Sequence, residues 1–211
     1  MLYGCREPHE LYPDWQRDFA RVAPLELEIG PGRGAFALDH AARHPGIDLV
    51  AIESRRSDCE LIRERAARRG LRNVIVLQGD ARLLVPRLFP PASLAAVHVQ
   101  FPDPWWKKRH HKRRMVDKEL AAQLRRQLAP GGIVDFRTDV EAYAREGGRT
   151  WLEAGFERLP DELPEVLSTR ERRYAVTGQP VFRARFRNPP GEVRVDAAAR
   201  TGRDWRDIRR K

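Results

Sequence analysis

The sequence contains only two cysteines, Cys5 and Cys59, and neither stands at the spacing of a metal-ligand pair. A reducing cytoplasm is therefore the compartment that we predict. No apolar run approaches the roughly 18 residues that a membrane-spanning helix requires. The first ten residues also lack the apolar core of a signal peptide. We therefore expect no membrane segment.

Acidic residues are too few to balance the basic ones. The chain of 211 residues has 30 Asp and Glu against 40 Lys and Arg, which gives a formal net charge of +10. Such an excess favours an anionic partner, and a membrane surface would also satisfy it. With 41% hydrophobic and 33% charged residues, the composition is that of a globular chain with one sizeable core.

Short apolar runs alternate with helix-like segments along the chain. This alternation predicts parallel βαβ units and an α/β fold with a doubly wound sheet. Polar residues at helix starts support the pattern, because Ser57 with Glu60 matches a capping box and Asp117 can cap the next helix. The predicted strands are 25–29, 47–52, 73–77, 94–99, 133–137 and 181–186, and the predicted helices are 35–43, 57–69, 118–128 and 141–154.

Three segments follow from this reading of the chain. Residues 1–24 form an irregular lead-in, which we expect to place Tyr12 and Trp15 on the main body. Residues 25–188 form the single domain, and residues 189–211 form a basic tail.

A glycine-rich turn, Gly30-Pro-Gly-Arg-Gly34, follows the first predicted strand. Glycines let the backbone turn sharply and let a ligand approach it closely. Gly30, Gly32 and Ala35 also satisfy the pattern G-x-G-x-x-G/A, which sites for NAD and for S-adenosylmethionine (SAM) share. Because doubly wound sheets bind ligands at the carboxyl ends of their strands, the turn predicts a cofactor site.

Three acids at predicted strand ends distinguish the two cofactors. Glu28 lies at the turn, Glu53 ends the second strand and Asp80 follows the third. They would repel a pyrophosphate, whereas SAM has no phosphate and carries a sulfonium and an ammonium group. We therefore predict SAM, with its ribose hydroxyls near Glu53 and its adenine amino group near Asp80. The alternative for Glu28 or Asp80 is a cap on a helix or turn.

The stretch that follows the fourth predicted strand, Phe101-Pro-Asp-Pro-Trp-Trp106, sets one carboxylate between two prolines and two tryptophans. Residues 107–114 then contain six Lys or Arg, two His and no acid. A carboxylate beside aromatic rings suits a flat, partly cationic group, and a basic run suits phosphates. This combination predicts chemistry on a base of a nucleic acid. The alternative is a turn followed by a solvated run of charges.

The segment Phe101-Pro-Asp-Pro-Trp105, followed by the basic run 107–114, resembles the signature of bacterial TrmB-type tRNA (guanine-N7)-methyltransferases. Gly178-Gln-Pro-Val-Phe-Arg183 resembles the same family, and the resemblance covers about residues 25–187. It implies a Rossmann-like class I SAM-dependent methyltransferase with a mostly parallel sheet and an antiparallel last strand. It also implies methyl transfer from SAM to N7 of guanine 46 in the variable loop of tRNA.

The resemblance implies a set of site residues as well, with Asp103 as the catalytic candidate. It implies tRNA as the partner, and we expect no obligate protein partner and either a monomer or a homodimer. The expected cofactor contacts are Glu28, Gly30, Gly32, Gly34, Glu53, Asp80 and Asp103. The expected substrate contacts are Lys107, Asp139, Ser168 and Glu171, and the expected RNA contacts are Arg109, His110, His111, Lys112, Arg113 and Arg114.

Three features depart from the family pattern. Ser168 replaces the usual threonine but keeps a hydroxyl group. Trp106 stands where the family has proline or a smaller polar group, which could reshape the pocket. Residues 189–211 extend past the usual end, and between Arg200 and Lys211 they carry six cations and two acids. This composition favours a disordered tail over an additional RNA-binding arm.

Several residue roles stay open at this point. Guanine N7 already carries an in-plane lone pair, so Asp103 can stabilise developing positive charge or accept hydrogen bonds from the guanine edge. Asp139 can be the cap of the helix that starts near residue 141. Glu171 can form a surface ion pair with neighbouring arginines, and Lys107 can pair with Asp103. We expect no metal site, because the two adjacent histidines of the basic run have no acid or cysteine at ligand spacing.

Two other functions remain open. The sequence Asp-Pro-Trp is related to the [DN]-P-P-[FYW] loop of amino-group methyltransferases, so another base or an amino group is a possible acceptor. A non-catalytic RNA-binding protein on a Rossmann scaffold is the second alternative. The set of four acids at strand ends favours an enzyme over that alternative.

Overall fold

The computed structural model describes residues 12–105, 109–110 and 114–190. Its strands are β1 (Leu25–Ile29), β2 (Asp48–Glu53), β3 (Val74–Gln78), β4 (Leu94–Gln100), β5 (Leu128–Thr138), β6 (Glu157–Arg158) and β7 (Phe182–Arg187). Its helices are α1 (Trp15–Phe19), α2 (Ala35–Arg43), α3 (Arg56–Arg68), α4 (Ala81–Leu88), α5 (Lys118–Gln127), α6 (Glu141–Glu153) and α7 (Thr169–Thr177). Among the described residues, no helix is long and apolar enough to cross a lipid bilayer.

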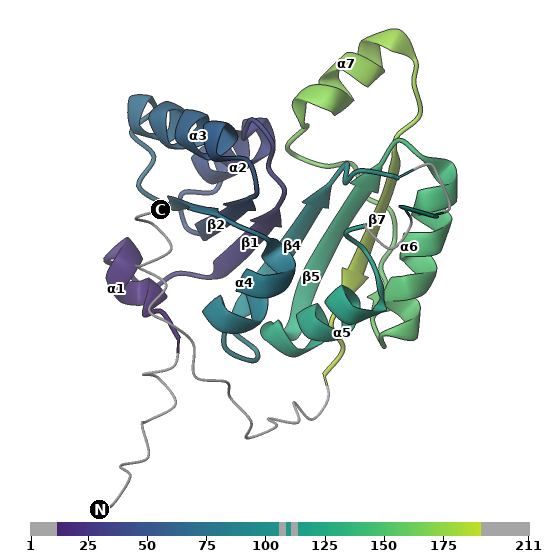
Figure 1. Cartoon of the computed structure of the whole chain (residues 1–211), viewed down its shortest axis with the longest axis horizontal. Coiled ribbons are helices and arrows are strands. Elements are labelled where there is room, and N and C mark those ends of the chain that lie inside the picture. Colours follow the sequence, from purple (N-terminus) through teal and green to yellow (C-terminus); the bar gives the residue numbers. More distant parts are fainter. Residues whose placement is uncertain (1–11, 106–108, 111–113, 191–211) are drawn as a thin grey trace, which may run out of the picture.

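The seven strands form one sheet in the order β3-β2-β1-β4-β5-β7-β6 (Figure 1). The pairs among β1 to β5 are all parallel, whereas β7 is antiparallel to both β5 and β6. The predicted α/β fold with a mostly parallel sheet and an antiparallel last strand is therefore confirmed.

Alternate residues of the strands face two hydrophobic clusters. On one face, Leu27 of β1 and Val97 of β4 belong to the larger cluster, to which α4, α5 and α6 contribute. On the other face, Ala51 of β2 packs with Leu38 of α2 and Ile62 of α3. Helices thus cover both faces, and α7 lies beyond the carboxyl ends of β4 and β5 (Figure 1).

The predicted N-cap residue is confirmed for α5 and wrong for α3. Asp117 caps α5 as predicted, since its Oδ1 accepts from the Leu120 N–H at 2.9 Å. The capping box predicted at Ser57 is wrong, because the N-cap of α3 is Arg55, two residues before Ser57. The Arg55 N–H donates to Glu53 Oε1 at 2.9 Å, and this contact at the end of β2 starts the helix ahead of Ser57.

Two elements on the larger core were not predicted correctly. Helix α4 was missed because Pro86, a residue that usually breaks a helix interior, lies inside it. The fifth strand was predicted to begin at residue 133, after a helix that ends at 128, but β5 already begins at Leu128. The register with β4 shifts there, and Gly131 adopts a φ of 84°, a conformation that glycine favours.

Helix α1 contributes to the core although it lies in the predicted lead-in. Trp15 is buried and stacks on Phe89 with ring centroids 5.5 Å apart. Its Nε1–H donates to the Leu88 carbonyl at 3.0 Å. The expected packing of Trp15 is confirmed, and the described part of the lead-in is not wholly irregular. The domain limits at residues 25 and 188 stay predictions.

Gly34 allows α2 and α3 to approach each other closely. It has a φ of 77° and precedes the first residue of α2. A Cβ atom at this position would lie only 2.6 Å from Ile62 Cγ1 on α3. The end of the glycine-rich turn therefore requires glycine for packing as well as for its backbone conformation.

We predict that Gly34→Ala lowers the free energy of unfolding by about 2 kcal/mol, because it adds a clash to the strain of a left-handed alanine. Urea denaturation in an Ile62→Ala background should reduce the effect to about 1 kcal/mol, since the clash is then removed. Gly46→Ala is the control, because a Cβ there meets no atom within 4 Å. Equal losses in the two backgrounds would contradict this account.

Candidate active site

The strand order brings five separate polar features to one edge of the sheet. The strands β3, β2, β1, β4 and β5 are neighbours, and a predicted site residue stands at or just after the end of each. In that order the features are Asp80, Glu53, the turn Gly30–Gly34, Asp103 and Asp139. Doubly wound sheets bind ligands at this edge.

Glu53 shapes the glycine-rich turn. Its Oε2 accepts from the Gly32 N–H at 3.0 Å, and its Oε1 accepts from the Ser54 hydroxyl and the Arg55 N–H. Gly30 and Gly32 have φ values of 69° and 56°, and a Cβ at either position would meet nothing within 4 Å. The turn therefore has a defined backbone with open space beside two glycines, where a ligand can approach.

Glu28 is buried at the end of β1, with 1% of its surface exposed. Its Oε2 has no hydrogen-bond partner among the described residues. Burial raises the pKa of Glu28 to about 8, so the carboxyl group is mostly uncharged at neutral pH in the absence of a ligand. One of the three acids that were expected to be charged is therefore mostly neutral, and its unpartnered Oε2 remains at the site.

Asp80 is the N-cap of α4. Its Oδ1 accepts from the Arg82 N–H at 2.9 Å, and the residue is exposed. The capping alternative for Asp80 is thus confirmed. Its expected contact with the cofactor stays a prediction, since a carboxylate has further lone pairs to offer.

The loop Phe101–Trp105 holds Asp103 on a constrained backbone. Phe101 and Trp105 adopt φ values of 50° and 45°, which are unfavourable for residues with a side chain by roughly 1 kcal/mol each. The Phe101 N–H donates to the Arg137 carbonyl at 2.8 Å. Asp103 lies between these two positions with its side chain exposed. The loop thus presents one carboxylate from a fixed position.

Arg114 supports this loop from beneath. Its Nε donates to the Pro104 carbonyl at 2.7 Å, and its guanidinium pairs with Glu146 and lies 4.9 Å from the centroid of the Tyr143 ring. Only 5% of the residue is exposed. The structure therefore places this expected RNA contact in the interior, where it positions the loop.

Other residues of the basic run are only partly described. Arg109 is exposed, and the His110 ring meets Trp105 edge-on with centroids 5.8 Å apart. Trp106, Lys107, His111, Lys112 and Arg113 lie outside the described residues.

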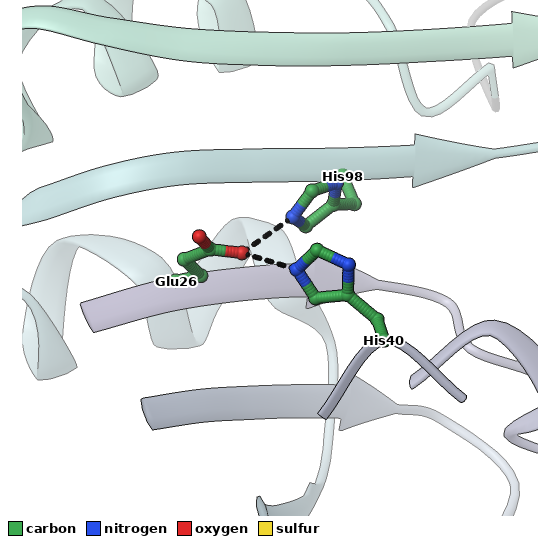
Figure 2. Close-up of side chains that lie close together, drawn as sticks. All are labelled: Glu26, His40 and His98. Atoms are coloured by element: carbon green, nitrogen blue, oxygen red, sulfur yellow. Dashed lines mark hydrogen bonds and ion pairs between the residues drawn. The ribbon is translucent and has the colours of Figure 1, made fainter. Parts of the chain in front are cut away.

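A group of titratable side chains is centred on Glu26, with His40 and His98 on either side of its carboxylate (Figure 2). Because side chains alternate along a strand, Glu26 lies on the same face of β1 as Glu28. Glu26 Oε2 is 2.7 Å from His40 Nε2 and 2.8 Å from His98 Nε2. Burial alone would raise the pKa of Glu26, but the two imidazoles hold it well below its usual range. Burial would likewise lower the pKa of His98, but Asp135 and Glu26 raise it to about 9. No local sequence pattern predicts this group, because Glu26, His40 and His98 are far apart in the chain.

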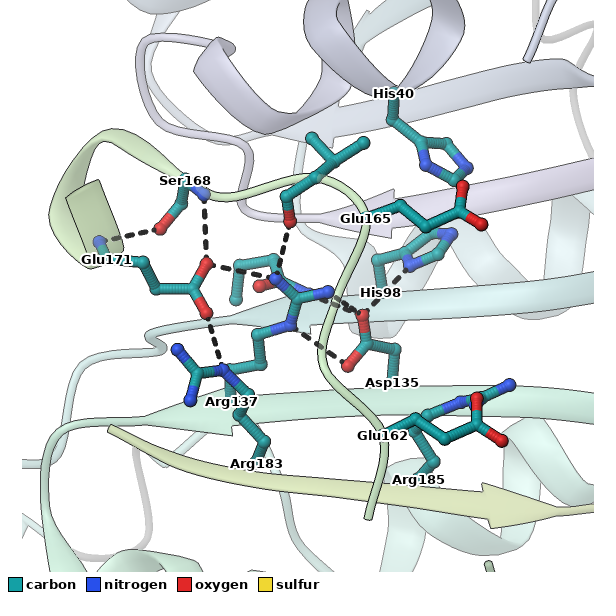
Figure 3. Close-up of polar contacts among 12 residues, drawn as sticks. His40, His98, Asp135, Arg137, Glu162, Glu165, Ser168, Glu171, Arg183 and Arg185 are labelled. Carbon is teal, nitrogen blue, oxygen red and sulfur yellow. Dashed lines mark hydrogen bonds and ion pairs between the residues drawn. The ribbon is translucent and has the colours of Figure 1, made fainter. Parts of the chain in front are cut away.

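Helix α7, which was not predicted from the sequence, begins with a capping box. Ser168 Oγ accepts from the Glu171 N–H at 3.2 Å, and Glu171 Oε2 accepts from the Ser168 N–H at 2.9 Å (Figure 3). The spacing Ser-x-x-Glu is the usual signal for this motif. Ser168 and Glu171, which were both expected to contact the substrate, thus form hydrogen bonds with each other.

The Glu171 carboxylate is also the centre of a buried ion-pair network. Arg137 Nη1 and Arg183 Nε each donate to it at 2.9 Å, and its side chain is 0% exposed (Figure 3). Arg137 Nη1 donates in addition to the Val166 carbonyl. The interpretation of Glu171 as a surface ion pair is therefore wrong: it is buried, and its partners come from β5 and β7.

Helix α7 also contacts the Asp103 loop and Asp139. The Tyr174 hydroxyl donates to Asp139 Oδ2 at 2.6 Å, and the Arg170 guanidinium lies 5.3 Å from the centroid of the Phe101 ring. Asp139 does not cap α6, because the N-cap residue is Val140, whose side chain makes no capping hydrogen bond and whose N–H donates to Thr138 Oγ1 at 3.2 Å. The helix-cap interpretation of Asp139 is therefore wrong, and the residue joins α7 to the end of β5.

Comparison with known proteins agrees with this geometry. Residues 22–184 match the model of a family described as "Putative methyltransferase". A tRNA (guanine-N(7)-)-methyltransferase of Anaeromyxobacter dehalogenans is 53% identical over 188 residues, which are 84% of this chain and 92% of that protein.

Solved structures share the fold at low sequence identity. The 16S rRNA methyltransferase KamB has a TM-score of 0.64 at 18% identity, over 85% of this chain and 95% of its own. A SAM-dependent methyltransferase from Aquifex aeolicus has a TM-score of 0.55 at 17% identity, over 86% and 93%. The fold is thus that of the class I SAM-dependent methyltransferases.

Sequence identity then identifies the family within this class of methyltransferases. Because one family model covers most of the chain and a relative of similar length is 53% identical, the chain belongs to the TrmB-type tRNA (guanine-N7)-methyltransferase family. Its cofactor is S-adenosylmethionine, and the site fits that molecule. The unpartnered Glu28 Oε2 and the open space beside Gly30 and Gly32 can receive polar groups of the cofactor.

We predict that Glu171→Ala weakens the docking of α7 by roughly 3 kcal/mol, because the buried Arg137 guanidinium loses one of its carboxylates. Hydrogen–deuterium exchange should show amides of Thr169–Thr177 exchanging about 100-fold faster. Glu60→Ala is the control: its carboxylate is exposed and pairs with Arg56 one helical turn away. That change should alter exchange less than about threefold. Unchanged protection of α7 in Glu171→Ala would show that the ion pairs do not hold the helix.

Proposed function

We propose that this chain transfers the methyl group of SAM to N7 of a guanine in tRNA, at position 46 of the variable loop. The observation that carries the proposal is the constrained loop Phe101–Trp105, which presents Asp103 at the strand end next to the glycine-rich turn. The name of the relative that is 53% identical supports the same substrate.

The chemistry of guanine N7 suits a site that positions its substrate. N7 has an in-plane lone pair, so no proton is removed before attack. SAM supplies an electrophilic methyl group on its sulfonium. The part of the protein is to align the base, and good alignment can lower a barrier by roughly 7–11 kcal/mol. The residues proposed to hold the cofactor are Glu28, Gly30, Gly32, Gly34, Glu53, Asp80 and Asp103.

Asp103 is suited to two tasks at once. Its exposed carboxylate can face the positive charge that develops on the purine during transfer. The same oxygens can accept from guanine N1–H and N2–H₂, a donor pair that adenine does not present. The prolines on both sides and the left-handed residues at the loop ends limit its movement.

Exposed arginines next to the strand ends supply a surface for phosphates. Arg109 follows the Asp103 loop, and Arg170, Arg172 and Arg173 are exposed on α7. Guanidinium groups bind phosphate oxygens through paired hydrogen bonds. Lys107, His110, His111, Lys112 and Arg113 of the basic run are proposed to extend this surface, whereas Arg114 lies in the interior. Asp139, half-buried beside Tyr174, is the proposed substrate contact at the end of β5.

Ser168 and Glu171 are proposed to act on the substrate indirectly. The Glu171 carboxylate accepts from Arg137, Arg183 and the Ser168 N–H, and its side chain has no exposed surface. These contacts leave it no approach to a nucleotide. The two residues instead hold α7 in place, and α7 brings Arg170 and Tyr174 to the Asp103 loop.

We predict that Asp103→Ala lowers kcat for methyl transfer from labelled SAM to unmodified tRNA by roughly 100- to 1,000-fold, as expected when a charge-stabilising group is removed. The label should appear as 7-methylguanosine after nucleoside digestion, at position 46 by fragment mapping. Asp161→Ala is the matched control, because Asp161 is exposed and pairs only weakly with Arg158.

Each alternative function has its own outcome in this experiment. Label on another base or on an exocyclic amine would keep the enzyme class and reject N7 of guanine as the acceptor. Binding of tRNA that does not depend on SAM, with no labelled product, would identify a non-catalytic RNA-binding protein. Equal activity of Asp103→Ala and wild type would remove Asp103 from the mechanism.

A further inference from the structure

Polar residues occupy the interiors of two central strands, where a doubly wound sheet normally has apolar ones. Strands β1 and β4 have neighbours on both sides, and such strands are usually near-continuous apolar runs. Yet Glu26 and His98 share one face of the sheet, and His40 of α2 meets them there (Figure 2). The side chains of Glu26, His40 and His98 are only 13%, 13% and 8% exposed. Burial of a polar or charged side chain is unfavourable unless it has a hydrogen-bond partner or an opposite charge beside it.

We propose that Glu26, His40 and His98 form a binding site for one divalent transition-metal ion of the zinc type. Their ligand atoms come from β1, α2 and β4 and lie within 4.8 Å of one another. Two imidazole nitrogens and one carboxylate oxygen are a ligand set that zinc uses, with a fourth position left for water. This site is separate from the methyl-transfer chemistry.

The ion takes the place of the protons that now lie between the carboxylate and the two rings. Zinc bonds to such atoms are about 2.0–2.2 Å long, so tetrahedral ligands stand about 3.3 Å apart. The separations from the carboxylate oxygen to the two ring nitrogens are 2.7 and 2.8 Å, so each must open by about 0.5 Å. All three ligand atoms lie within 4.8 Å of one another, and the two ring nitrogens must settle at the same tetrahedral spacing. Each imidazole binds through its Nε2 lone pair and keeps one proton on Nδ1. The His98 imidazolium loses its Nε2 proton to solvent, and the neutral His40 ring moves its single proton from Nε2 to Nδ1.

Asp135 lies on the side of the His98 ring that faces away from Glu26. Its Oδ2 is 3.7 Å from His98 Nδ1, which is longer than a hydrogen bond, and Nδ1 has no hydrogen-bond partner among the described residues. A small shift of the ring on metal binding would bring Nδ1–H within reach of this carboxylate. A carboxylate at the second nitrogen of a ligand histidine is the common outer partner in zinc sites. Arg137 holds Asp135 through both Nε and Nη2, so its position is fixed (Figure 3).

The ring positions are constrained, and the site is reachable. Phe36 stacks on His40 at 5.1 Å between centroids and lies 5.0 Å from His98. At the rim, the His44 ring lies 4.5 Å from His40, and His44 Nε2 is 3.4 Å from Glu165 Oε2. The Glu165 side chain is 75% exposed, so these two residues provide donor atoms between solvent and the buried ligands.

A bound ion would tie α2 to the two central strands. Because α2 carries His40 and begins directly after Gly34, a metal bound to His40 would also restrict movement of the glycine-rich turn. Binding to the folded state alone stabilises a protein by mass action, so occupancy should raise the melting temperature.

The test uses the full chain after treatment with a chelator, titrated with Co²⁺ and with Zn²⁺. We expect one ion per chain, a visible Co²⁺ absorption typical of four-coordinate sites, and a rise in Tm with Zn²⁺. His40→Gln and His98→Gln should each weaken Zn²⁺ binding by at least about 100-fold, because even outer partners of ligands contribute about 10- to 100-fold.

His110→Gln is the matched control, since His110 lies against Trp105 in the basic run and not on α2. It should bind Zn²⁺ as wild type does. Binding that is lost in His110→Gln but kept in His40→Gln would place the ion on the basic run and overturn the proposal. If a histidine variant does not fold, the wild-type spectrum still decides: no four-coordinate Co²⁺ absorption means that the group is a hydrogen-bonded triad only.

Discussion

The buried guanidinium of Arg137 is the group on which the arrangement of the site depends. Its side chain is 5% exposed and lies between Asp135 on its own strand and Glu171 on α7. A charge so deeply buried is tolerated only when its partners are in place. The Arg137 carbonyl also receives the Phe101 N–H. Arg137 therefore contacts the Asp103 loop and α7 directly, and it contacts the His98 group through Asp135. It fixes the positions of these three parts relative to one another.

Much of the sheet could be predicted from local pattern. The strands around residues 25–29 and 94–100, and the glycine turn between β1 and α2, follow from apolar runs and turn residues that neighbours in sequence define. The two missed helices either contain a residue that normally breaks helices or lack the periodic apolar residues that predict a helix. Pro86 concealed α4, and the polar sequence Thr169–Thr177 concealed α7, although Ser168 and Glu171 carried its capping signal.

The site was predictable as a set of residues but not as a set of contacts. A motif match identified Asp103, Arg114, Ser168 and Glu171 together, yet the structure gives them different environments. Asp103 is exposed, whereas Arg114 and Glu171 are buried and paired with groups more than thirty positions away or on other strands. Such pairings depend on how β5, β7 and α7 meet, and no local pattern encodes that geometry. The same reason hid the group around Glu26.

The left-handed residues at the ends of the Asp103 loop have a consequence for how this chain can change. Glycine at position 101 would relieve backbone strain of roughly 1 kcal/mol, but it would also delete a ring that packs against Arg170 and Tyr174 of α7. A strained backbone persists only where the surrounding structure holds it. Release of α7 would therefore let Phe101 return to an ordinary conformation, and Asp103 would move with it. The position of this carboxylate thus depends on a helix that supplies no catalytic group.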